Sequence, residues 1–319
     1  MKNENNYFFI QHFVDDFFKN NIIINHEITA KEFKKILHSE FDDSEFCELL
    51  IYAGYIPDMY LPDSSEETLF SKLIEVIVCE WCERMGFVSN FVKQKASYED
   101  VNFMINGKVI VCDAKSFRLG RSQKAPNVKD FLKLEDIRKW LSRHKNKLGG
   151  LVTYPCTHEW TKSSDAYQYC SDKTIPTLML PYKYLAYLLA YKDNYDKDEL
   201  AKLWNYSSIF PKKLDKKMKG GNKEAYWKKI DKEIIKVTNT SEKEFNEYMD
   251  NAHCLITGYM NEILLLMNDI KMDIYNKIKN ELADMDDIDK IRTEFINNRL
   301  NVESKNITEY IDRINKFRM

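Results

Sequence analysis

The chain has 319 residues, 44% of them hydrophobic, and this apolar content excludes an intrinsically disordered protein. Its 48 Lys and Arg residues against 50 Asp and Glu give a net charge of −2, so any nucleic-acid binding requires positive charge gathered on one surface. Seven irregularly spaced cysteines predict reduced thiols and a cytoplasmic location, and no apolar run approaches the ~18–20 residues that cross a bilayer.

The first sixty residues predict a helical region that precedes the rest of the fold. Apolar spacing and capping residues favour helices over Tyr7–Lys19, Thr29–His38 and Ser44–Gly54. Pro57 and Pro62 then interrupt the chain. We therefore expect residues 1–60 to form an amino-terminal helical region.

A long helix is expected over Ser65–Met85, with Gly86 as its stop signal. Its apolar residues recur with the period of a buried helix face. Glu67, Ser71 and Glu75 are spaced four residues apart, so they form a separate line along the same helix. This line carries two acids that could face either solvent or a site.

A β-hairpin is predicted around Asn106-Gly107, because a type I′ turn needs positive φ at both central residues and this dipeptide provides it. In that register Asp100 lies opposite Asp113, and Lys115 shares a sheet face with Asp113. Opposed residues have Cβ atoms roughly 4.5–5.5 Å apart, so two like charges there destabilise the sheet. The expected pairs nearer the turn are Ile105 with Lys108 and Phe103 with Ile110.

Two interpretations account for the crowded carboxylates at the end of this hairpin. Asp100 and Asp113 could be surface acids with Lys115 as their counter-charge. A divalent cation explains them better, since Mg²⁺ prefers carboxylate oxygens at ~2.0–2.1 Å and removes the penalty of ionising neighbouring acids. A lysine beside such a metal can orient or deprotonate a water, which suits phosphodiester hydrolysis.

The segment after the hairpin predicts a basic loop followed by further α/β structure. Its basic residues are Arg118, Arg121, Lys124, Lys129 and Lys133. We expect a helix over Lys129–Lys147 ended by Gly149-Gly150, then short buried strands over Leu151–Tyr154 and Thr177–Leu180. The polar loop between the strands contains Thr161 and Lys162, which suit contacts to DNA bases or phosphates or an ordinary surface. A helix is expected to follow over Tyr182–Tyr191.

The last third of the chain predicts helices. Residues 211–236 are dense in lysine, including Lys212 and Lys213, and could form either a positive DNA-contact surface or a solvated helix face. Further helices are expected over Glu242–Ala283 and Ile288–Phe317. Their apolar residues could pack on the core or form a dimer surface.

The residues around the hairpin resemble a known nuclease superfamily. Asp100, followed by Asp113-Ala114-Lys115 on the next strand, is similar to the PD-(D/E)XK motif, with Glu99 in place of its leading proline. The longer segments resemble the HindIII-type type II restriction endonucleases over roughly residues 45–240. These segments are Ser64–Lys72, Asp113–Leu119 with Arg121, Lys129–Phe131, Leu203–Asn205, Phe210–Lys213 and Tyr226–Lys229.

The resemblance implies roles for individual residues. Asp100, Asp113 and the carbonyl of Ala114 would bind Mg²⁺, and Lys115 would position or activate the attacking water. A helix acid, best matched by Glu67, and the later acid Asp130 could complete the site. The family lysine that follows this later acid is replaced here by Leu132. The DNA-contact candidates are Arg118, Arg121, Lys129, Thr161, Lys162, Lys212 and Lys213.

The resemblance also implies an activity and a fold. The activity is Mg²⁺-dependent cleavage of both strands of double-stranded DNA at a palindrome, with AAGCTT as the expected site. A two-fold homodimer would match that symmetry, and a cognate DNA methyltransferase would act on the same site without direct contact. The alternatives are a structure-specific repair or recombination nuclease on the same core and a non-catalytic DNA-binding protein.

The implied fold is α/β, with a restriction-endonuclease-like three-layer core, a mixed central sheet, and extensive amino- and carboxy-terminal helices. The expected organisation has a helical region over 1–60, a nuclease core over 61–195 and a helical DNA-contact or dimerisation region over 196–319. We expect these three regions to form one integrated domain.

Overall fold

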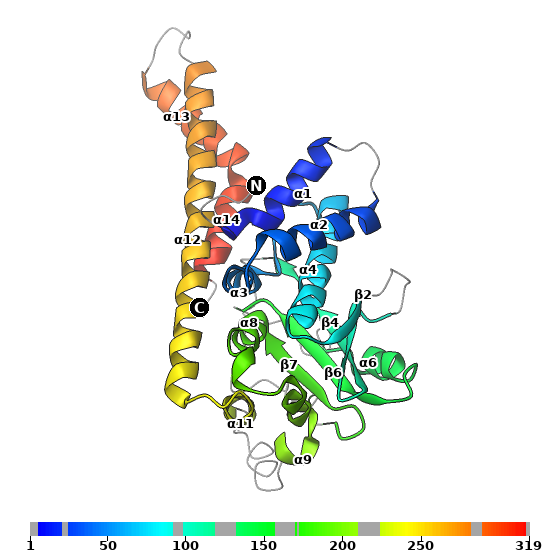
Figure 1. The fold of residues 1–319 in the computed structure, drawn as a ribbon. Helices are drawn as coiled ribbons and strands as arrows, with labels where there is room; N and C mark the ends of the chain where they lie inside the picture. The colour runs from blue at the N-terminus through cyan, green and yellow to red at the C-terminus, as the bar shows by residue number, and fades with distance from the viewer. Residues whose placement is uncertain are drawn as a thin grey trace.

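The protein was analysed as a computed structural model that describes residues 6–20, 25–91, 98–118, 132–156, 170, 172–209, 224–281 and 289–316. In these residues a five-stranded mixed sheet, with strand order β2-β3-β4-β6-β7, forms the centre of the molecule (Figure 1). β2, β3 and β4 are antiparallel, and β4, β6 and β7 are parallel. The strands are β2 (Val88–Phe91), β3 (Val101–Ile105), β4 (Lys108–Ala114), β6 (Lys147–Tyr154) and β7 (Thr177–Pro181). The predicted mixed sheet is thus confirmed.

The β3–β4 hairpin forms at the predicted turn. Asn106 and Gly107 have φ of 52° and 68°, the positive values that the turn requires. The partners are those expected, Ile105 with Lys108 and Phe103 with Ile110, and the regular pairing ends at Val101 with Cys112. Asp100 lies one residue before β3, and its backbone N–H donates to the Cys112 carbonyl at 3.1 Å. The hairpin therefore carries Asp100 to the end of β4, where Asp113 lies.

Helices cover both faces of the sheet. α4 (Ser65–Arg84) places the Trp81 ring edge-on against Phe103, with 6.0 Å between ring centroids. α6 (Leu134–Leu141) approaches so closely that a Cβ on Gly150 would lie 2.7 Å from a methyl of Ile137. Gly150 pairs with Val111, and Phe103 pairs with Ile110, the residue before Val111. Because neighbouring strand residues point to opposite faces, Gly150 and Phe103 lie on opposite faces of the sheet. α4 and α6 thus lie on opposite faces, which gives the predicted three layers.

Gly149-Gly150 does not end a helix, and the predicted helix over Lys129–Lys147 is wrong in its second half. The described helix ends at Leu141, and β6 begins at Lys147. A Cβ on Gly149 would clash with the Pro176 carbonyl and the Trp204 ring. The two glycines are therefore needed for the close approach of neighbouring elements to a buried strand.

The amino-terminal helices lie close to where the sequence predicts them, and the first two long ones pack against α4. They are η1 (Asn6–Phe8), α1 (Phe9–Asn20), α2 (His26–Glu40) and α3 (Asp43–Tyr52). A small parallel pair of strands, β1 (Tyr55–Ile56) and β5 (Phe117–Arg118), joins the end of this region to the chain after β4. The pairing brings the loop before α4 next to the segment that follows Lys115.

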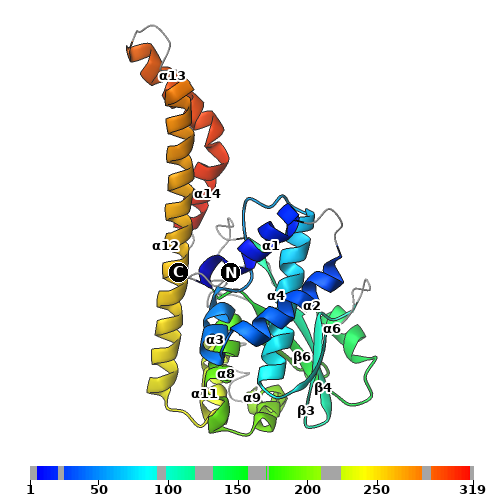
Figure 2. The same cartoon turned by 45° about the horizontal axis from the view of Figure 1, so that its top comes forward.

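The carboxy-terminal helices form a long projection. α12 (Glu242–Glu281) runs along one side of the core and extends well beyond it, and α13 (Asp289–Glu303) and α14 (Lys305–Lys316) return along it (Figure 2). The helix expected over Ile288–Phe317 is thus two helices, with a break at Ser304. The remaining elements are α8 (Tyr182–Ala190), η2 (Lys192–Asn194), η3 (Lys197–Trp204), α9 (Tyr206–Ile209) and α11 (Glu224–Val237). None of the helices in the described ranges is long and apolar enough to cross a membrane.

Candidate active site

The end of β4 brings together the three residues that the sequence predicts as catalytic. Asp113 is buried, and the Lys115 ammonium lies 2.7 Å from its Oδ2 atom. The Ala114 backbone N–H donates to Oδ2 of Asp100 at 2.8 Å, which draws that carboxylate toward the same strand end. The site therefore combines two acids, a lysine and the backbone of Ala114.

The backbone at Lys115 is held from three sides. Its N–H donates to the Thr153 carbonyl at 2.8 Å, and its carbonyl accepts from the Tyr182 hydroxyl at 2.8 Å. Gly54 packs against the same carbonyl, because a Cβ there would lie 3.1 Å from it, and its φ of +86° also favours glycine. These contacts fix the position from which the Asp113 and Lys115 side chains depart.

The carboxylates repel one another. Burial is the main cause that raises the pKa of Asp100 well above its ordinary value, and the charges of Glu75 and Asp113 raise it further. Burial also raises the pKa of Glu75, against the opposing effect of Lys72 and with an added contribution from Asp113. Such acids ionise readily only when positive charge is supplied. The cluster therefore has the electrostatics expected of a cation site.

Glu75 is the helix acid that interacts with this cluster, and sequence comparison alone favours Glu67. Glu67 lies elsewhere, because its carboxylate accepts from the Asp63 backbone N–H at 2.6 Å and from Arg118 at 3.0 Å. The sequence contains the signal for Glu75, since it lies on the same helix line as Glu67, two turns further on. Only the three-dimensional arrangement shows which of the two acids faces Asp100 and Asp113.

We expect Glu75→Gln to lower the rate of DNA cleavage by at least about 100-fold, because it removes a negative charge beside the metal candidates. Glu67→Gln is the matched control on the same helix. It should retain cleavage within about threefold and lower the free energy of unfolding by about 1 kcal/mol through its weakened ion pair with Arg118. Single-turnover cleavage and urea unfolding of both variants make the comparison. Equal loss of cleavage in the two variants would contradict the assignment of Glu75.

The Arg118 guanidinium contacts other groups of the same chain. In addition to Glu67, it contacts the Pro57 carbonyl at 3.1 Å and lies 4.0 Å from Asp58. Asp58 in turn accepts from Arg313 of α14 at 2.8 Å. This chain of ion pairs links the strand after Lys115 to the carboxy-terminal helices.

Several predicted site residues lie outside the described residues. They are Arg121, Lys129, Asp130, Thr161, Lys162, Lys212 and Lys213. Leu132, which replaces the family lysine, is described and is buried in the core. It cannot take over a charged role near the catalytic strand.

The residues that could hold a divalent cation are oxygen donors. Within the described ranges, no three side chains of His, Cys, Asp or Glu converge closely enough to form a metal site. The candidate donors that the sequence predicts are the carboxylates of Asp100 and Asp113 and the carbonyl of Ala114, and these three residues meet at the end of β4. This small set of hard oxygen ligands fits Mg²⁺, which usually keeps several waters.

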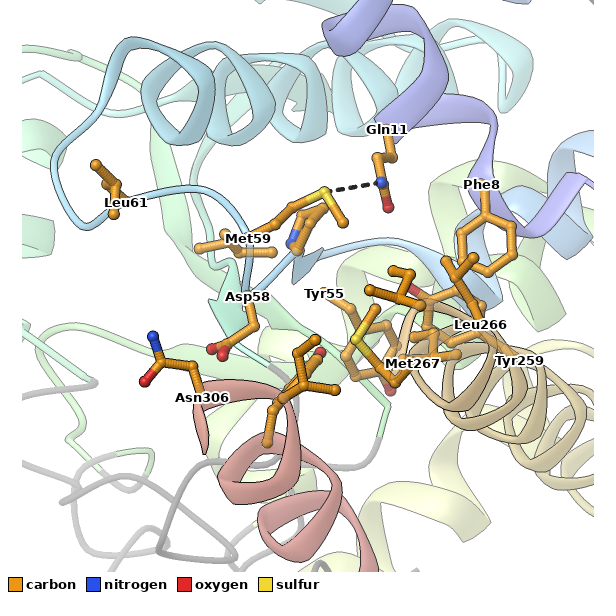
Figure 3. A pocket seen from close by; sticks show the side chains of 16 residues that line it. Phe8, Gln11, Tyr55, Asp58, Met59, Leu61, Tyr259, Leu266, Met267 and Asn306 are labelled. Atoms are coloured by element: carbon orange, nitrogen blue, oxygen red, sulfur yellow. Dashed lines mark hydrogen bonds between the residues drawn. The ribbon is translucent and has the colours of Figure 1, made fainter. Parts of the chain in front are cut away.

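A pocket lies away from these residues, between the loop after β1, α1, α12 and α14 (Figure 3). It has a volume of about 360 Å³ and is mainly apolar, with Phe8, Tyr55, Met59, Tyr259 and Met267 among its lining residues. None of the predicted catalytic residues lines it. This pocket is therefore separate from the site at the end of the hairpin.

Two comparisons identify what the chain is similar to. Residues 27–283 match the family described as HindIII restriction endonuclease. The type II restriction enzyme HindIII of Haemophilus influenzae is 26% identical over 250 residues, which cover 74% of this chain and 73% of that protein. The matched residues include β3, β4 and α4, which carry the candidate site.

Proposed function

Because the chain belongs to the HindIII restriction endonuclease family, we propose that this site-specific deoxyribonuclease uses Mg²⁺ to cut both strands of DNA at AAGCTT. The observation that carries the proposal is the arrangement at the end of β4. There, Lys115 contacts Asp113, and Asp100 bonds to the intervening residue. This arrangement combines oxygen ligands for a metal with a lysine beside them.

In this proposal each residue has a defined task. Asp100, Asp113 and the Ala114 carbonyl would hold Mg²⁺, which when bound stabilises negative charge on the phosphate and lowers the pKa of a water. Lys115 orients that water for attack by donating a hydrogen bond from its ammonium group, which lies beside Asp113. Tyr182 keeps the strand end in place through the Lys115 carbonyl. Cleavage by such a site leaves 5′-phosphate and 3′-hydroxyl ends.

DNA binding in this proposal relies on basic and polar residues outside the described ranges. Arg121, Lys129, Thr161 and Lys162 would contact bases or phosphates near the site, and Lys212 and Lys213 would contact phosphates. Arg118 would act differently, since its guanidinium is bound to Glu67. A palindromic site would be read by a two-fold homodimer, and a methyltransferase would protect the same sequence.

The specificity is tested with a set of DNA duplexes that carry AAGCTT or each of its single-base variants. We expect cleavage of AAGCTT and about 5- to 150-fold slower cleavage of every variant, since each lost base-edge contact costs roughly 1–3 kcal/mol. Fragment lengths on a sequencing gel give the site and the cut positions. Cleavage of an unrelated hexamer beside intact AAGCTT would show that the family likeness extends to the chemistry and not to the sequence read.

A further inference from the structure

Lys72 is a charged residue on α4 that is only 6% exposed. Burying an ammonium group is unfavourable unless a negative group compensates its charge. Its Nζ atom lies 2.5 Å from Oε2 of Glu75 and 4.2 Å from the centroid of the Phe91 ring. The ammonium is therefore held between a carboxylate and an aromatic face.

This ion pair lies close to the candidate metal ligands, because Phe91, whose ring contacts the Lys72 ammonium, pairs with Val101, the residue that follows Asp100. Glu75 interacts electrostatically with both Asp100 and Asp113. The cluster thus pairs one ammonium with Asp113, through Lys115, and a second with Glu75, through Lys72. In this arrangement the Glu75 carboxylate is directed to Lys72.

We propose that Lys72 is a positioning residue that holds Glu75 as its counter-ion and thereby sets the divalent-cation affinity of the Asp100–Asp113 site. Glu75 then acts by neutralising Lys72, and it does not bind the metal itself. The inference rests on the proposed function, because it concerns the same metal site. The site would thus have two lysines, Lys115 from the sequence motif and Lys72 from α4.

Mn²⁺ binding to the full-length protein tests this role without DNA cleavage. Electron paramagnetic resonance of free Mn²⁺ at pH 8.5 gives the dissociation constant for each variant. Glu75→Gln should weaken binding about tenfold or more, because it leaves the Lys72 charge uncompensated near the metal. Lys72→Met should tighten binding by a similar factor, because it leaves the Glu75 charge unopposed.

The double variant separates a counter-ion from a ligand. Lys72→Met with Glu75→Gln removes both charges and should return Mn²⁺ affinity to within about threefold of wild type. Circular dichroism checks that each variant is folded, and the neutral double variant avoids an unpaired buried charge. Lys34→Met is the control, because Lys34 of α2 forms a 2.5 Å ion pair with Glu83, which lies on α4 as Glu75 does. It should leave Mn²⁺ affinity unchanged.

Two results would overturn this inference. If the double variant binds Mn²⁺ as weakly as Glu75→Gln, Glu75 is itself a metal ligand. If Lys72→Met binds Mn²⁺ as wild type does, Lys72 has only a structural role. Asp113→Asn distinguishes both outcomes from failure of the proposed metal site, since Mn²⁺ affinity unaffected by that variant would refute the site itself.

Discussion

Asp113→Asn is expected to lower the single-turnover rate of DNA cleavage by at least about 10³-fold. The substitution keeps the shape of the side chain and removes the negative charge that would bind the metal. Asp113 is buried, and its carboxylate lies 2.7 Å from the Lys115 ammonium, so the lost charge lies within the candidate site. DNA affinity measured in Ca²⁺ or without metal should stay within about threefold, because phosphate contacts by basic residues supply most of it.

Asp198→Asn is the control for this experiment. Asp198 accepts a hydrogen bond from the Asn106 backbone N–H at 3.3 Å, at the opposite end of the same hairpin. It should cleave DNA as wild type does, since its carboxylate has no contact with the catalytic strand end. Cleavage at the wild-type rate by Asp113→Asn would remove the basis for the metal site.

Lys115→Ala is expected to lower the cleavage rate by about 10²- to 10³-fold, because it removes the ammonium group that orients the attacking water. The side chain is only 22% exposed, but its backbone contacts to Thr153 and Tyr182 do not depend on it. The fold should therefore be retained, with the free energy of unfolding lowered by about 1–3 kcal/mol because the buried Asp113 carboxylate loses its ion-pair partner. Rapid-quench cleavage assays and urea unfolding measure the two quantities.

Lys108→Ala provides the comparison for Lys115, because Lys108 is an exposed lysine at the start of β4. It should retain wild-type cleavage and stability. If Lys115→Ala also cleaves at the wild-type rate, its ammonium serves only as a counter-charge for Asp113. That is the simpler interpretation which the sequence leaves open.

The β3–β4 hairpin could be predicted from the sequence because its determinants are local. Asn106 and Gly107 set the turn, and the turn sets the register of every pair in β3 and β4. The meeting of Asp100, Asp113 and Lys115 then follows from strand alternation. Such an inference needs no knowledge of how distant elements pack.

The roles of Glu75 and Gly149 could not be predicted in the same way, because they depend on packing between elements far apart in the sequence. The helix line contains two acids, and only the docking of α4 on the sheet selects the one near Asp113. Gly149 resembles a helix stop until the Pro176 carbonyl and Trp204 ring are placed against it. In both cases the local pattern was compatible with more than one structure.

The central claim, a metal-dependent and sequence-specific nuclease, is tested most directly by digesting one sequenced plasmid with the purified protein. The reaction is run with Mg²⁺ and, in parallel, with EDTA, and the ends of the products are mapped on both strands. The account predicts discrete double-strand fragments that form only with Mg²⁺, carry 5′-phosphate ends and share one short palindrome at every cut. Cleavage in EDTA, or a smear of products without a common sequence, would contradict it.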